Sequence, residues 1–130
     1  MNTSDFLDTK IEALKHNGNL LDTVSEGNKY AKFKWTPGNN YRVSFRCNDF
    51  SSGTDFILAY KNVNYAVGAK QCFGNLNEAL MYADFIYALC RNSKSIKPGG
   101  YIYRYRDYYR NIYVIDMDNN NIISQVILFD

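Results

Sequence analysis

Residues 76–91 constrain the fold most strongly, because they predict a helix that is apolar on nearly every side. Asn75 and Glu78 stand at the spacing of a capping box, which marks the start of this helix. The apolar residues that recur at helical spacing are Leu76, Ala79, Leu80, Ala83, Ile86 and Cys90. The other sides of the helix are also apolar, with Met81, Phe85 and Leu89. Such a helix must be largely covered, either by a sheet of the same chain or by another subunit.

Segments that alternate as strands do lie on both sides of this helix. They predict three hairpins: one over residues 29–47 with a five-residue loop at 36–40, one over residues 55–70, and one around residues 118–121. The end of the last hairpin is apolar without alternation, which favours a central strand covered on both faces. A sheet is therefore expected to cover the helix.

The remaining segments complete an α+β pattern. Residues 4–16 predict a helix with one narrow apolar face that ends before Gly18, whereas residues 19–28 show no recognisable pattern. Residues 101–106 alternate as a further strand. The order is helix, four strands, helix, three strands. We therefore predict one α+β domain over residues 1–130, with a mainly antiparallel sheet of about six or seven strands and two helices packed on one face.

Composition supports a folded, cytoplasmic protein. A chain of 130 residues that is 46% apolar and 22% charged can bury one core and is too apolar to stay disordered. Its start lacks a secretory apolar stretch, and no run approaches the roughly 18 apolar residues of a membrane helix. The three cysteines show no paired spacing, which is typical of buried free thiols in a reducing compartment.

The segment from Tyr101 to Arg110 is the strongest functional signal, with five tyrosines and three arginines in ten residues. As a strand, it would place its tyrosines on one face and Arg104 and Arg106 on the other. The register of the first hairpin likewise sets Lys34 opposite Arg42, and facing like charges destabilise a ladder unless an anion lies above them. We interpret both features as a sheet surface that attracts an anionic partner.

Two interpretations without a ligand fit the same pattern. The basic blocks alternate with acidic ones along the chain, so neighbouring segments could neutralise each other on a solvated surface. Tyrosine is also a good strand former, and tyrosine packed across strands on arginine stabilises a half-exposed sheet by itself.

Patterns for catalysis and metal binding are weak. Asp116, Asp118 and Asn120 imitate the first ligands of a calcium loop, but the later glycine and glutamate are missing, so a hairpin turn explains them better. A thiol nucleophile at Cys47 or Cys72 would need a base, and the single histidine ends the first helix. We therefore predict no enzymatic activity, no metal site and no cofactor. An enzyme that uses one of these thiols as its nucleophile is a third functional hypothesis, after the two binding functions given below.

The sequence thus predicts a small, non-enzymatic intracellular binding protein, an inhibitor or adaptor such as mobile genetic elements encode. A basic, tyrosine-rich sheet surface would occupy an acidic site on a partner protein. The alternative is nucleic-acid or nucleotide binding by the same surface. The oligomeric state is left open, with a homodimer among the alternatives. The predicted contact residues are Lys32, Lys34, Arg42, Arg46, Tyr103, Arg104, Tyr105, Arg106, Tyr108, Tyr109 and Arg110.

Overall fold

The computed structural model describes residues 3–48 and 55–129, which contain helices and eight strands. In chain order these are α1 (Thr3–His16), β1 (Leu20–Ser25), β2 (Asn28–Phe33), β3 (Tyr41–Ser44), β4 (Asp55–Tyr60), β5 (Val63–Gly68), β6 (Lys70–Phe73), α2 (Leu76–Arg91), the 3-10 helix η1 (Lys94–Ile96), α3 (Tyr101–Arg104), β7 (Asn111–Asp116) and β8 (Asn121–Ile127). The predicted α+β class and single domain are confirmed. None of the helices within the described ranges has both the length and the apolar character that crossing a bilayer requires.

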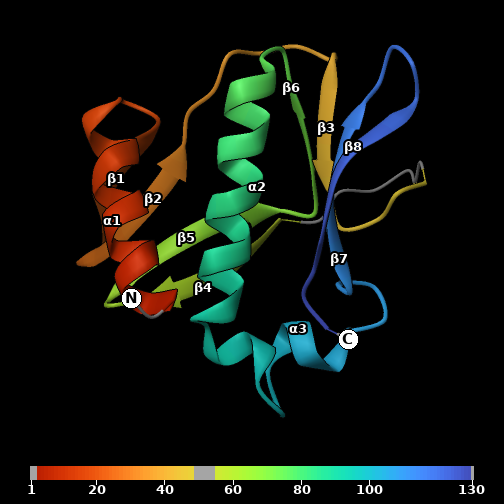
Figure 1. The fold of residues 1–130 in the computed structure, drawn as a ribbon. Coiled ribbons are helices and arrows are strands. Elements are labelled where there is room, and N and C mark those ends of the chain that lie inside the picture. The colour runs from red at the N-terminus through yellow and green to blue at the C-terminus, as the bar shows by residue number, and fades with distance from the viewer. Residues whose placement is uncertain (1–2, 49–54, 130) are drawn as a thin grey trace.

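The strands form two four-stranded sheets rather than the single sheet predicted (Figure 1). The first sheet has the order β1-β2-β5-β4, and the second has the order β6-β3-β7-β8. Neighbouring strands are antiparallel except β2 and β5, which are parallel. α2 runs lengthwise through the middle of the molecule with α1 beside it, and it contacts strands of both sheets. The core therefore lies around this helix, as its apolar surface requires.

The start of α2 is confirmed, but Glu78 plays a different part from that of a capping box. Asn75 Oδ1 accepts the Glu78 N–H at 3.1 Å, which satisfies one open donor of the first turn. The Glu78 carboxylate accepts the Thr36 N–H at 2.9 Å and the Asn19 side-chain N–H at 3.1 Å. It thereby ties the helix start to the segments that flank β1 and β2.

α1 also forms as predicted. Leu7, Ile11 and Leu14 recur at helical spacing and are all buried. Gly18 follows the helix with φ at 79°, in the left-handed region that glycine enters without steric cost. The helix therefore ends where its apolar face ends.

The first predicted hairpin is wrong. β2 pairs with β1 and β5, whereas β3 lies in the other sheet between β6 and β7. β1 and β2 meet at a two-residue turn in which Glu26 and Gly27 both have positive φ (52° and 80°), a geometry that suits the twist of a hairpin. Only Leu20 of β1 is buried, so the strand does not need alternating apolar residues, and the sequence of residues 19–28 gave no sign of it. Lys34 and Arg42 consequently do not face each other across a ladder.

The other two hairpins are confirmed, since β4 pairs with β5 and β7 pairs with β8. The turn between β7 and β8 also forms as predicted: Asp116 Oδ1 accepts the Asp118 N–H at 3.0 Å and the Asn119 N–H at 3.4 Å. The prediction that the last strand is central is wrong. β8 is an edge strand with mostly exposed residues, and Ile122, for example, is half exposed.

Candidate functional site

The tyrosine-rich segment is not a strand. Tyr101–Arg104 form α3, and residues 105–110 continue as turns. The Arg104 N–H donates to Gly100 O at 2.9 Å, and the Tyr109 N–H donates to Tyr105 O at 3.1 Å, so the backbone groups are satisfied locally. The predicted separation of tyrosines and arginines onto two faces of a strand is therefore wrong.

Two apolar contacts hold this segment against the core. Ile102 is fully buried. The Tyr109 ring meets the Phe45 ring edge-on at 4.8 Å and the Phe56 ring at 5.3 Å between centroids. Burial is the main cause that raises the pKa of Tyr109 well above its ordinary value. Tyr109 was predicted as a contact residue, but its ring is only 3% exposed and belongs to the core.

The three arginines of the segment are exposed, and one of them, Arg106, lies on a tyrosine ring, as does Arg46 from another part of the chain. The Arg106 guanidinium is 4.5 Å from the centre of the Tyr103 ring, and it donates to Tyr103 O at 2.9 Å. The Arg46 guanidinium, from the chain just after β3, is 5.1 Å from the centre of the Tyr108 ring. Such contacts contribute about 0.5–1 kcal/mol each at exposed sites and orient the guanidinium plane. The neighbouring charged and aromatic side chains form what we call the Tyr–Arg cluster: Arg46, Tyr103, Arg104, Tyr105, Arg106, Asp107, Tyr108 and Arg110.

A small hollow of about 180 Å³ lies at one side of the cluster, and four cluster residues line it in part: Arg46, Asp107, Tyr108 and Arg110. Arg110 is paired with Asp107 at 3.1 Å, and this pair is exposed. Within residues 3–48 and 55–129, the other arginines of the cluster have no carboxylate within ion-pair distance. Four arginines against one aspartate leave this surface positive, with donors available to an anion.

Besides the buried Tyr109, three further predicted contact residues lie outside the cluster. Arg42 is only 3% exposed and donates to Cys47 O at 3.1 Å and to Asn48 O at 3.3 Å, so it supports the chain after β3 and is not available to a partner. Lys32 and Lys34 line a different groove, of about 390 Å³, on the first sheet. The contact residues that were predicted to form a single surface therefore lie in separate parts of the molecule.

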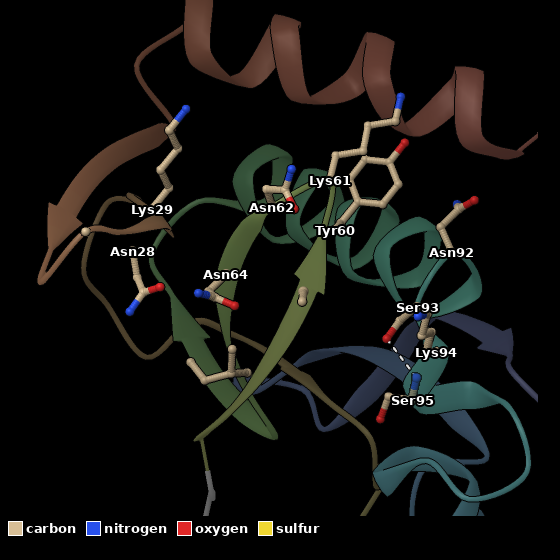
Figure 2. A pocket seen from close by; sticks show the side chains of 13 residues that line it. Asn28, Lys29, Tyr60, Lys61, Asn62, Asn64, Asn92, Ser93, Lys94 and Ser95 are labelled. Atoms are coloured by element: carbon tan, nitrogen blue, oxygen red, sulfur yellow. Dashed lines mark hydrogen bonds between the residues drawn. The ribbon is translucent and has the colours of Figure 1, made fainter.

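A further concave region lies at the end of the β4–β5 hairpin, as an open cleft of about 960 Å³. Figure 2 shows Asn28 and Lys29 on one side of this hairpin and the segment from Asn92 to Ser95 on the other. The polar side chains that line the cleft are Asn28, Lys29, Tyr60, Lys61, Asn62, Asn64, Asn92, Ser93, Lys94 and Ser95. This lining offers amide groups and three ammonium groups, which suit a polar anionic ligand.

One of these lysines is already engaged. Lys61 Nζ lies 2.7 Å from Asp8 Oδ2, and the Tyr60 hydroxyl donates to Asp8 Oδ1 at 2.6 Å. The hydrogen bond from Lys61 is the main cause that lowers the pKa of Asp8, and the one from Tyr60 lowers it further. The same bond to Asp8 raises the pKa of Lys61. In Figure 2 both side chains point toward α1. Lys29 and Lys94 are therefore the cations with which the cleft would receive a ligand.

Nothing in the sequence marked this cleft. Its lining comes from the β1–β2 turn, the β4–β5 hairpin and the chain after α2, which are far apart in sequence. Each segment alone reads as an ordinary polar turn. Only the tertiary arrangement brings them to one place.

The cysteines differ sharply in exposure, which gives a testable prediction. Cys47 is exposed, contrary to the expectation of buried thiols, Cys72 is partly buried, and Cys90 is fully buried with its pKa raised to about 12 by burial. A thiol-reactive dye at neutral pH should label Cys47 first, Cys72 more slowly, and Cys90 only in urea. Mass spectrometry of the labelled peptides would check this order, and early labelling of Cys90 would contradict the described packing.

The comparisons with known proteins identify no family for this chain. Searches against protein-family models, curated proteins and solved structures found no match. The chemistry of the two surfaces described above is therefore the basis for assigning a function.

Proposed function

We propose that this protein is a non-catalytic, cytoplasmic binding protein whose Tyr–Arg cluster occupies an acidic site on a partner protein, as an inhibitor or adaptor does. The observation that supports this best is the set of exposed arginines oriented by tyrosine rings, Arg46 on Tyr108 and Arg106 on Tyr103. A guanidinium that uses its face for an aromatic ring keeps its N–H edge available for a carboxylate.

The way in which the cluster is held favours binding further. Ile102 and Tyr109 anchor the segment in the core, so its arginines and tyrosines lose less conformational freedom on binding than those of a loose loop. Tyr101 and Tyr105 are each nearly half exposed and offer apolar area beside the charges. Aromatic and arginine side chains together are typical of the residues that dominate protein interfaces.

The test is a pair of variants with equal change in charge. Arg46→Glu/Arg106→Glu alters the cluster, and Lys32→Glu/Lys34→Glu, on the first sheet, is the matched control. Fluorescence anisotropy would measure binding to a labelled glutamate-rich peptide. We expect the cluster variant to bind about tenfold more weakly or worse, since it loses two charged contacts, and the control to change by about twofold or less. Equal losses in both variants would show only general charge attraction and contradict the proposal.

Capture from the native host would then identify the partner. The wild-type protein and Arg104→Glu/Arg106→Glu would be used as baits under the same conditions. A protein retained by the wild type alone, and having an acidic surface, is the expected result. If the same proteins are retained by both baits, the cluster is not the binding surface.

A second candidate function is the binding of a nucleotide or nucleic acid, and the cleft in Figure 2 favours it. Its volume of about 960 Å³ lies within the range of small-molecule sites, about 300–1,000 Å³, and Lys29 and Lys94 line it. Lys29→Glu/Lys94→Glu should then abolish binding of a nucleoside triphosphate and leave binding of the glutamate-rich peptide unchanged. A single-stranded oligonucleotide would be the further probe, and its affinity should fall steeply with salt.

A further inference from the structure

The groove on the first sheet beside Lys32 and Lys34 combines an apolar wall with two ammonium groups. Its volume is about 390 Å³, and its lining residues other than these lysines are apolar: Leu21, Phe33, Trp35 and Pro37. Leu21 is 47% exposed, and Trp35 is partly exposed. Sites for small molecules are typically concave and mostly apolar, with a few polar groups that fix the orientation of the ligand, and their volumes begin at about 300 Å³. The groove has the composition of such a site and a size near the lower end of its range.

Trp35 forms a wall of the groove that is fixed in advance. Its indole N–H donates to Cys72 O at 2.8 Å. Its ring lies 5.0 Å from the Phe73 ring and 6.4 Å from the Tyr82 ring, between centroids. These contacts hold the ring in one orientation while part of its surface remains accessible. An aromatic ligand can pack on such a ring, and little conformational freedom of the protein is lost when it does.

The segment that follows this tryptophan is also held firmly. The Thr36 N–H donates to Glu78 Oε1 at 2.9 Å, and the Gly74 N–H donates to Thr36 O at 3.1 Å. Gly38 lies so close to Gly74 that a Cβ on Gly38 would come within 2.5 Å of Gly74 Cα, so this close approach requires glycine. Pro37 lies between these contacts, and its own ring fixes its φ. The groove is therefore formed before a ligand arrives.

The two lysines of the groove lie on the same face of the sheet. Lys32 pairs with Leu21 in the β1–β2 register, and the Lys34 N–H continues the ladder by donating to Asn19 O at 2.7 Å. The Cα atoms of the two lysines are therefore about 7 Å apart, with both side chains on one side. Both are exposed, and in the described part of the chain neither has a carboxylate within ion-pair distance. Asp55, which lines a neighbouring hollow together with Lys32, lies beyond that distance. The two ammonium groups are thus complementary to an anionic group of a ligand whose body lies on the apolar wall.

We propose that this groove binds a small aromatic carboxylate, with its ring against Trp35 and Leu21 and its carboxylate between Lys32 and Lys34. The charges favour an anion, the fixed indole favours an aromatic body, and the volume suits a compact ligand. The proposal is independent of the proposed function, because it does not involve the Tyr–Arg cluster. A glutamate-rich peptide has no apolar body to fill the groove, so the two lysines remain a valid control in the test of that cluster.

Nuclear magnetic resonance can observe this groove directly, because Trp35 is the only tryptophan of the chain. Its indole N–H gives a single signal of its own in a proton–nitrogen correlation spectrum. The protein would be titrated with naphthoate and, as the matched neutral ligand, with naphthamide. We expect both to move the indole signal and naphthoate to bind about tenfold more tightly, because an exposed ion pair contributes up to about fivefold in affinity and the groove offers two. An indole signal that does not move up to the solubility limit of naphthoate would overturn the proposal, and so would equal affinities for the two ligands.

Paired variants separate the charges of the groove from general charge attraction. Lys32→Gln/Lys34→Gln should bind naphthoate about tenfold more weakly and bind naphthamide as the wild type does. Lys29→Gln/Lys94→Gln removes the same charge from the cleft at the β4–β5 hairpin and is the matched control, which should bind both ligands as the wild type does. Equal losses of naphthoate affinity in the two variants would contradict the proposal.

Two further measurements test the apolar wall and the kind of ligand. Leu21→Ser should weaken the binding of both naphthyl ligands by about threefold or more, because it removes an apolar contact, and an unchanged affinity would place the ligand elsewhere. An acidic peptide with a single phenylalanine tests for a protein partner. If this peptide moves the indole signal at lower concentrations than naphthoate does, the groove serves a protein partner and the assignment to a small carboxylate is wrong.

Discussion

Replacing Phe33 with alanine should lower the free energy of unfolding by about 3–5 kcal/mol, the usual cost of removing a buried aromatic side chain. Phe33 is 3% exposed. Its ring lies 5.0 Å from the Tyr82 ring, and 6.3 Å from the Phe73 and Phe85 rings, between centroids. Phe33 is in the first sheet and Phe73 in the second, while the other two rings are on α2. The alanine variant would therefore leave a cavity at the junction of both sheets and the central helix.

Urea unfolding followed by circular dichroism measures this loss. Small domains have total stabilities of about 5–15 kcal/mol, so Phe33→Ala could leave little folded protein at room temperature. Phe33→Leu, which keeps most of the apolar volume, should cost less and keep the measurement within range. Val24→Ala, at a position 70% exposed, is the surface control and should change stability by about 0.5 kcal/mol or less. A similar loss for Val24→Ala and Phe33→Ala would contradict the described core.

Raising the pH above about 10 should destabilise the protein progressively, because the folded protein buries tyrosine side chains in their neutral form. Burial is the main cause that raises the pKa of Tyr65 to about 12 and that of Tyr82 still further. In the unfolded chain these hydroxyls ionise near pH 10. Their contribution to stability is therefore complete below pH 10 and is lost as the pH rises through the folded-state pKa. Each unit of difference between the two pKa values corresponds to about 1.4 kcal/mol.

The measurement is the free energy of unfolding in urea between pH 8 and pH 12, and Tyr65→Phe isolates one group. This variant should lose less stability than the wild type between pH 10 and about 12, because phenylalanine has no proton to release. Tyr105→Phe is the control for removing a tyrosine hydroxyl outside the core, since Tyr105 is 48% exposed. Parallel pH profiles for Tyr65→Phe and the wild type would show that Tyr65 is not the source of the alkaline loss.

The helices α1 and α2 and two of the hairpins could be predicted because their signals are local. Asn75 caps α2 through a hydrogen bond only three residues away, and the apolar period of the helix spans adjacent turns. β4 and β5 are consecutive and joined by a two-residue turn at Lys61 and Asn62, so closing them costs little chain entropy. Such elements form from neighbouring residues, and their pattern is visible in the sequence.

Pairing between distant strands could not be predicted in this way. Alternation indicates that a strand has two faces, but it does not indicate which other strand lies beside it. β2 and β3 both alternate, yet they belong to different sheets. The same limit explains the error at residues 101–106. No strand in the described part of the chain pairs with this segment, and burial of Ile102 and Tyr109 favours a short helix followed by turns.

The sequence by itself determined that this chain is an α+β protein with a basic, tyrosine-rich segment, because composition and local period are enough for both. The tertiary structure alone decided which cations are exposed. Arg42 and Arg46 have the same parity and would share the outer face of one strand. β3 ends at Ser44, so Arg46 projects beyond the sheet onto Tyr108, whereas Arg42 is buried under the carbonyl groups of residues 47 and 48. Burial depends on which segments cover a face, and that is a property of the folded chain.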